Sequence, residues 1–144
     1  MALPPWFALL QDTLQREGTF RWTVQGTSMV PTLRPGTTIE IVPATEPIAL
    51  GALVVFARRD SLVVHRLVRR TNGQWITQGD GRSLPDPPID REQVLGIAAR
   101  AYEADREYWP GRTARVLAMF WLFRYHVGRV ARIVQRRISG LLHG

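Results

Sequence analysis

The stretch from Ser61 to Gln78, SLVVHRLVRRTNGQWITQ, carries the clearest indication of the fold. Apolar, often β-branched residues recur through 61–69 and again through 74–78, as in strands that bury one face. Asn72-Gly73 stands between the two segments. This dipeptide favours the backbone of a two-residue hairpin turn. The stretch therefore predicts two antiparallel strands joined by a tight turn.

Similar short segments extend outward on both sides of this hairpin. They are separated by glycine, proline and polar residues, and they cover residues 19–25, 37–42, 52–57 and 94–101. Short strands at this spacing, without a long helical segment among them, predict a mainly β fold: a small barrel or sandwich over residues 19–110.

Helices are expected at both ends of this β-rich body. Residues 1–18 contain Pro4 and Pro5, followed by Trp6, Phe7 and leucines, and end at Gly18, a pattern that predicts a short amphipathic helix. The apolar run from Trp6 to Leu10 is far shorter than the roughly 20 residues of a membrane span, and no basic segment precedes it. We therefore expect neither a signal peptide nor an N-terminal anchor.

The C-terminal segment, residues 111–144, predicts one long helix from about Arg112 to Leu142. At 100° per residue its apolar side chains gather on one arc, comprising Val116, Phe120, Phe123, Val127, Val134 and Ile138. Four arginines lie on the other side, at positions 115, 129, 132 and 136. Two interpretations stay open: a helix lying at an anionic membrane surface, or one packed on its own domain or on a partner.

Composition excludes several kinds of chemistry. All nineteen Lys and Arg residues are arginine, so no lysine base or Schiff base is available. The chain has no cysteine, which excludes disulfides, thiolate metal sites and a cysteine nucleophile. The net charge of +7 comes from the C-terminal segment, where seven arginines follow position 111 without an acidic residue. An anionic partner is therefore expected there.

Ser28 and His65 are the candidate catalytic residues. Ser28 lies in a turn over residues 26–36 that contains two glycines and two prolines, and such a stiff turn can hold a serine and orient nearby amides. A serine hydroxyl needs a base. His65 is the one histidine inside the β-rich body, since His126 and His143 lie in the C-terminal helix.

Four segments of this chain, in order over roughly residues 24–100, resemble the type I signal peptidase family. Ser28-Met29-Val30-Pro31-Thr32-Leu33 is similar to its serine motif, and Gly51-Ala52-Leu53-Val54-Val55-Phe56 to its next strand. Val64-His65-Arg66-Leu67-Val68 resembles the motif with the general base, and Gln78-Gly79-Asp80 with Val94-Leu95-Gly96 resembles the last motif and its closing strand. The family also resembles the catalytic domains of self-cleaving repressors.

The resemblance implies roles for further residues. Bacterial members usually have lysine as the base, whereas the branch of archaea and the endoplasmic reticulum has histidine, as here at His65. In that branch Asp80 or Asp86 would accept the Nδ1 proton of the histidine, and the sequence leaves open which one does. The backbone amide of Ser28 would donate to the oxyanion. Met29 and Pro31 are expected to contact the substrate, and no cofactor or metal is expected.

Some features depart from the family. No anchor precedes Ser28, Gly26 stands where some bacterial members have a hydroxyl residue, and Gly81 and Arg82 replace asparagines common in the histidine branch. We expect a serine endopeptidase that cleaves an extended signal or leader peptide. The alternatives are a pseudoenzyme that holds peptides without cutting them, and a nucleic-acid-binding protein that contacts phosphate through its C-terminal arginines. Specific nucleic-acid recognition is not expected.

Overall fold

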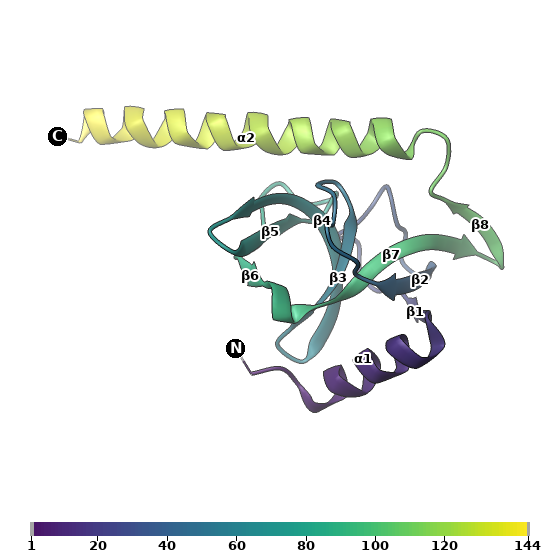
Figure 1. Cartoon of the computed structure of the whole chain (residues 1–144). Helices are drawn as coiled ribbons and strands as arrows, with labels where there is room; N and C mark the ends of the chain where they lie inside the picture. Colours follow the sequence, from purple (N-terminus) through teal and green to yellow (C-terminus); the bar gives the residue numbers. More distant parts are fainter. Residues whose placement is uncertain (1, 144) are drawn as a thin grey trace.

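The computed structural model describes residues 2–143, which form a curled antiparallel sheet with one helix at each end (Figure 1). Helix α1 (Pro5–Glu17) precedes β1 (Phe20–Thr23) and β2 (Thr38–Pro43). The following strands are β3 (Leu53–Arg58), β4 (Ser61–Thr71), β5 (Gln74–Gln78), β6 (Ile89–Asp90), β7 (Val94–Glu103) and β8 (Arg106–Trp109). A 3-10 turn, Arg91–Gln93, leads into β7, and helix α2 (Ala114–Leu142) ends the chain.

The strands form one open sheet in the order β1-β2-β7-β3-β4-β5-β6, with β8 beside β7. The six expected strands are all present, and the hairpin turn at Asn72-Gly73 is confirmed because both residues have positive φ angles, of 49° and 76°. The mainly β prediction is thus confirmed, with an open sheet in place of a closed barrel. Strands β6 and β8 were not predicted, because they have only two and four residues.

Each face of the curled sheet is covered by its own apolar cluster. One cluster joins Phe7 and Leu14 of α1 to Ile39, Leu53 and Val55 of the sheet. The other lies on the opposite face, where Phe56 and Leu67 meet Trp75. Alternation along β3 explains the division, since Val55 and Phe56 are successive residues that point to opposite faces.

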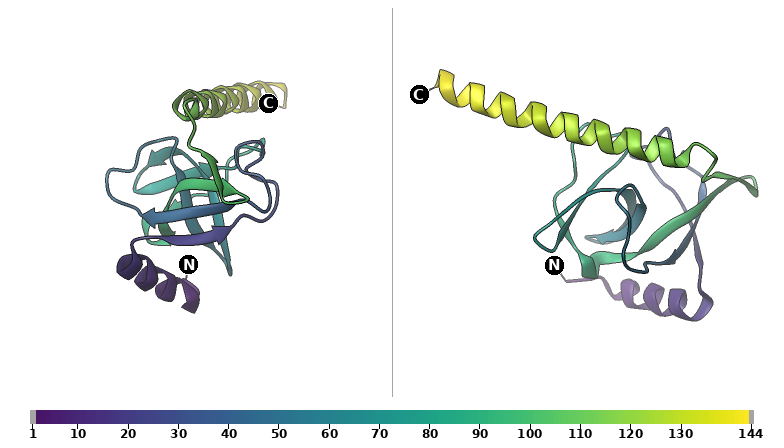
Figure 2. Two further views of the ribbon diagram at one scale, coloured as in Figure 1. Left: turned by 90° about the vertical axis from the view of Figure 1, so that its right-hand side faces the viewer. Right: turned by 45° about the horizontal axis from the view of Figure 1, so that its top comes forward.

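Helices α1 and α2 lie at opposite ends of the curled sheet (Figures 1 and 2). Helix α1 starts with a proline in its first turn and ends at Gly18, whose φ of 77° lets its N–H bond the carbonyl of Leu14 at 2.9 Å. No helix within residues 2–143 is long and apolar enough to span a membrane.

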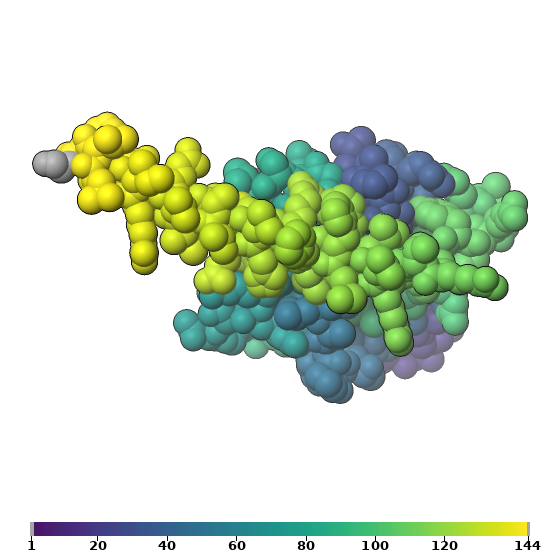
Figure 3. All heavy atoms as spheres, turned by 90° about the horizontal axis from the view of Figure 1, so that it is seen from above, coloured from purple at the N-terminus to yellow at the C-terminus, as the bar shows by residue number. Residues whose placement is uncertain are grey.

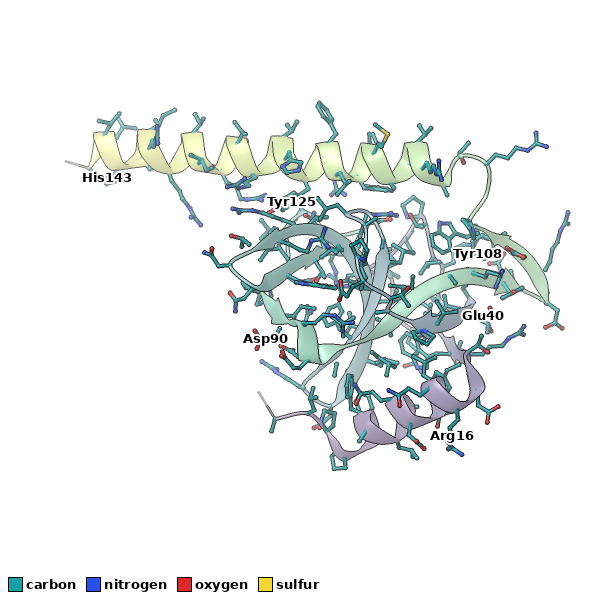
Figure 4. All side chains as sticks on the ribbon, viewed as in Figure 1. Arg16, Glu40, Asp90, Tyr108, Tyr125 and His143 are labelled. Atoms are coloured by element: carbon teal, nitrogen blue, oxygen red, sulfur yellow. The ribbon has the colours of Figure 1, made fainter. Side chains whose placement is uncertain are left out.

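Helix α2 packs on the sheet with the side opposite its apolar arc. Ala118 and Leu122 lie against Gly51, and Tyr125 is buried at the interface (Figure 4). The apolar arc, by contrast, is exposed, with Phe120 at 53% and Phe123 at 68% exposure. The second half of α2 extends beyond the body (Figure 3). Packing on its own domain, one of the two interpretations left open by the sequence, therefore applies to the first half of α2, and the contacting side is not the apolar arc.

Candidate active site

Ser28 is held in place by the apolar residues that surround it in the turn between β1 and β2. Met29 and Leu33 are only 1% and 0% exposed, and the amide of Leu33 donates to the carbonyl of Met29 at 2.9 Å. The amide of Val30 bonds the carbonyl of Thr27 at 3.1 Å. These contacts explain why a turn contains large apolar side chains: they anchor it in the core while Ser28 stays partly exposed.

His65 on β4 lies within hydrogen-bonding distance of Ser28. Its Nε2 is 3.0 Å from Ser28 Oγ. The ring is 4% exposed and meets Phe56 edge-on, with ring centroids 6.1 Å apart. Pairing of His65 with Val54 on β3 fixes its backbone. The structure thus brings together a nucleophile and a base that are 37 residues apart in sequence.

Asp86, and not Asp80, is the carboxylate that contacts His65. Its Oδ2 accepts a hydrogen bond from His65 Nδ1 at 2.5 Å and another from Thr77 Oγ1 at 2.6 Å. Arg58 Nη2 lies 3.3 Å from Oδ1. With the proton on Nδ1, the lone pair of Nε2 faces the serine hydroxyl, which is the orientation that a general base needs.

The net charge balance around Asp86 favours its ionised form. Burial by itself would raise the pKa of this carboxyl, but the hydrogen bond and electrostatic interaction with His65, the hydrogen bond from Thr77 and the positive charge of Arg58 outweigh burial. The pKa of Asp86 therefore lies below its ordinary value. An ionised Asp86 can hold the imidazole ring and stabilise the imidazolium that forms when His65 takes a proton.

Asp80 belongs to a different buried network. Its carboxylate accepts two hydrogen bonds from Arg66, at 2.8 and 2.7 Å, and one from Thr32 Oγ1 at 2.5 Å. Arg66 also donates to the carbonyl of Gly51 at 2.7 Å. The sequence left two possible partners for His65, and Asp80 is not the one that contacts it. Asp80 instead forms an ion pair with Arg66.

The segment around Asp80 nevertheless supports Ser28 through its backbone. The amide of Gly81 donates to the carbonyl of Ser28 at 2.8 Å. A Cβ at Gly79 would collide with that carbonyl and would lie 3.1 Å from His65 Nε2. Glycine at position 79 is thus required by close approach of two backbones, and any side chain there would displace the serine or the histidine.

The other predicted site residues lie in different environments. The Ser28 amide donates to no backbone acceptor among the turn and loop hydrogen bonds within residues 2–143, and its role toward an oxyanion stays a prediction. Pro31 is exposed beside a surface hollow. Met29 is buried, and its sulfur accepts a hydrogen bond from the Asp80 amide at 3.4 Å. The side chain of Met29 therefore belongs to the core, and its contact with a substrate stays a prediction.

Several residues of the site had no sequence signal of their own. Thr77 and Arg58 support Asp86, and Arg66 and Thr32 hold Asp80. Arg124 of α2 donates to the carbonyl of Asp80 at 2.8 Å and to that of Arg82 at 2.7 Å. Alternation along β4 places His65 and Arg66 on opposite faces, which could have indicated that each needs its own carboxylate.

No cluster of His, Cys, Asp and Glu that could hold a metal ion occurs in the part of the chain that the structure describes. The arrangement present is that of a serine, a histidine and a carboxylate connected in series. Such a series can activate a hydroxyl group for attack on a carbonyl.

Comparison with known proteins agrees with this chemistry at the level of a family. No curated protein matches the chain. The family model described as Peptidase S24-like matches residues 5–101, which contain Ser28, His65 and both aspartates. The match supports a serine-peptidase-like domain, while the narrower type I signal peptidase assignment stays a prediction. Because the matched residues make up more than half of the sequence, the chain belongs to the Peptidase S24-like family.

Proposed function

We propose that this protein is a serine endopeptidase of the signal-peptidase type, with Ser28 as nucleophile, His65 as base and Asp86 as the residue that orients the base. The observation that carries the proposal is the continuous connection from Ser28 Oγ to His65 Nε2, at 3.0 Å, and from His65 Nδ1 to Asp86 Oδ2, at 2.5 Å. A serine, a histidine and a carboxylate connected in this order activate the serine for nucleophilic attack in hydrolases of unrelated folds.

The proposed reaction proceeds in two stages. His65 Nε2 takes the proton of Ser28 Oγ as the oxygen attacks a peptide carbonyl, and the Ser28 amide donates to the developing oxyanion. The resulting imidazolium, stabilised by Asp86, then gives its proton to the leaving amine. A water molecule, deprotonated by His65, hydrolyses the acyl-enzyme and restores the serine.

The substrate is proposed to be an extended signal or leader peptide with small side chains near the scissile bond. Strand β1 pairs with β2 alone, and residues Ser61–His65 of β4 pair with β3 alone among the described strands. Each therefore has a free edge near the site. A peptide strand can add to such an edge through backbone hydrogen bonds.

A serine-directed acylating probe tests the chemistry. Wild-type protein should be labelled, and Ser28→Ala and His65→Ala should not be. Ser139→Ala is the matched control, because Ser139 is exposed on α2 and should not affect labelling. Labelling that persists in Ser28→Ala would refute the nucleophile. A wild-type protein that binds peptides but is never labelled would favour the pseudoenzyme.

We propose further that α2 lies on an anionic membrane surface. Its exposed apolar residues face away from the sheet, and none of the seven arginines after position 111 forms an ion pair within residues 2–143. The helix is about 43 Å long at 1.5 Å per residue. An exposed apolar arc on a helix whose other side carries unneutralised arginines is the pattern of a helix that binds anionic lipid.

Vesicle flotation with the full chain tests this placement. Wild-type protein should float with vesicles containing phosphatidylglycerol and much less with phosphatidylcholine alone. Replacing Phe120 and Phe123 by serine should abolish flotation, whereas Leu9→Ser, an equally exposed change on α1, should not. If the double variant floats as well as wild type, the membrane proposal is wrong. If it instead changes the mass in sedimentation, the apolar arc joins two copies of the chain.

A further inference from the structure

Helix α2 reaches the active site through the side chain of Arg124. This helix lies outside the family match, which ends at residue 101. Arg124 Nη1 donates to the carbonyl of Asp80 at 2.8 Å, and Nη2 donates to the carbonyl of Arg82 at 2.7 Å. Both carbonyls belong to the segment Gly79–Arg82, which follows β5. One guanidinium therefore holds two points of a segment that is distant from it in the sequence.

The same segment contacts the backbone of Ser28. Gly81 lies between the two residues whose carbonyls Arg124 binds, and its amide donates to the carbonyl of Ser28 at 2.8 Å. A Cβ at Gly81 would lie only 2.8 Å from the carbonyl oxygen of Thr27 and 2.9 Å from that of Val30. The segment thus packs against the turn that holds Ser28 without space for a side chain. A shift of the segment must therefore shift Ser28 as well.

Arg124 is itself held in a fixed position. Its guanidinium lies over the ring of Trp121, 5.0 Å from the centroid. The helix packs closely on the turn before β3, since a Cβ at Gly51 would lie 3.2 Å from Ala118 and 3.6 Å from Leu122. The planar guanidinium presents two donors in a rigid geometry. The position of α2 is therefore transmitted to the segment by one well-restrained side chain.

The charge of Arg124 strengthens this link. Arg124 forms no ion pair within residues 2–143, so its charge is directed at the two carbonyls. Hydrogen bonds from a charged donor are roughly twice as strong as those from a neutral one. Gln78 Nε2 gives the Arg82 carbonyl a second donor at 2.8 Å, but that donor is neutral. Arg124 is therefore the charged restraint on this part of the backbone.

We infer that Arg124 is a positioning residue of the active site, which acts through Gly81 and holds Ser28 in place for attack. This inference rests on the proposed peptidase function. A reacting group that is displaced reacts slowly even when the substrate still binds. Loss of Arg124 should therefore slow the chemical step. Peptide binding should be nearly unchanged, because the hydrogen bonds of Arg124 go to the segment Gly79–Arg82 and not to the free strand edges.

Steady-state cleavage of a peptide by the full chain with Arg124→Ala tests this role. Its kcat should fall about tenfold below that of the wild type, with KM nearly unchanged, and the serine-directed probe should label Ser28 more slowly by a similar factor. Arg124→Lys keeps the charge but lacks the planar fork, so its kcat should lie between those of the wild type and Arg124→Ala. Arg106→Ala, an exposed change on β8, is the matched control and should keep the wild-type kcat.

The kinetic constants separate positioning of Ser28 from simple attachment of α2 to the sheet. If Arg124 only attached the helix, Arg124→Ala would lose stability, but the protein that remains folded would keep its kcat. A wild-type kcat in Arg124→Ala, or a loss confined to KM, would overturn the inference. Cleavage by the wild type would in that case leave the peptidase proposal intact.

Amide exchange gives a readout that does not depend on cleavage. The amide of Val30 bonds the carbonyl of Thr27 within the turn that holds Ser28. Exchange of the Val30 amide should accelerate in Arg124→Ala and stay unchanged in Arg106→Ala. If the wild type neither cleaves nor is labelled, the peptidase proposal fails, whereas accelerated exchange at Val30 still shows that Arg124 restrains this turn. Unchanged exchange at Val30 would overturn the inference.

Discussion

Asp80 and Asp86 stand near the two ends of the segment that connects β5 to β6, and the two ends differ in the cation that each carboxylate meets. Asp80 binds Arg66, a side chain that is 2% exposed and permanently charged. Asp86 binds His65, a ring that can gain and lose a proton during a reaction. The same residue type is therefore structural at one end and suited to catalysis at the other.

The difference originates on β4. His65 and Arg66 are consecutive residues and point to opposite sides of the strand. One connecting segment supplies a carboxylate to each of them. Four predictions follow, and the first two would fail if the two aspartates were equivalent.

The largest effect is expected for Asp86→Asn. Loss of the charge leaves His65 without its orienting partner, so kcat/KM should fall by about 10³- to 10⁴-fold. Steady-state cleavage of a peptide by the folded protein measures this. Asp105→Asn, on an exposed turn, is the control and should retain full activity. If Asp86→Asn loses less than tenfold, the orienting role is refuted.

Asp80→Ala should mainly destabilise the fold. It leaves the Arg66 guanidinium buried without a carboxylate, and breaking a buried pair in this way costs about 3–5 kcal/mol of unfolding free energy. Urea denaturation measures the loss. Adding Arg66→Met should restore part of it, because no unpaired charge remains. A double variant less stable than Asp80→Ala alone would contradict this explanation.

The third prediction concerns how the stability of the fold changes at low pH. The pKa of Asp86 is lowered by its partners in the folded protein. Its charge therefore contributes stability above the unfolded-state pKa of about 3.9, and this contribution is lost as the pH falls through the lower folded-state pKa. Wild-type protein should be more stable than Asp86→Asn at pH 7, and the difference should shrink toward about pH 2. Urea midpoints across this range measure it; a difference independent of pH would contradict the prediction.

The smallest effect is expected for Arg124→Ala. This arginine links α2 to the carbonyls of Asp80 and Arg82, and loss of two partly exposed hydrogen bonds should cost about 1–2 kcal/mol locally. Amide exchange at Gly79–Arg82 should accelerate, because the segment loses its restraint from α2. Arg136→Ala, an exposed change further along the helix, should leave this exchange unchanged. If the amides of Gly79–Arg82 exchanged at the same rate in Arg124→Ala and Arg136→Ala, Arg124 would not restrain this segment.

Local patterns were sufficient for six of the eight strands and for the candidate pair Ser28 and His65. Alternation along β4 and the Asn72-Gly73 turn depend on neighbouring residues, so a sequence reveals them. Strands β6 and β8 have no such pattern, and they form because longer strands pair with them. The burial of Met29 also escaped prediction, since a turn next to a nucleophile gives no sign of which side chain faces inward.

The sequence by itself determined the residue types available for chemistry: no lysine, no cysteine, and one histidine within the β-rich body. It also determined the mainly β fold and the arc of apolar residues on α2. Only the tertiary structure decided that Asp86 contacts His65, that Asp80 pairs with Arg66, and that the apolar arc of α2 faces away from the sheet. Each of these depends on which distant side chains share a buried space, because a buried charge must find a partner there that residue order along the chain does not specify.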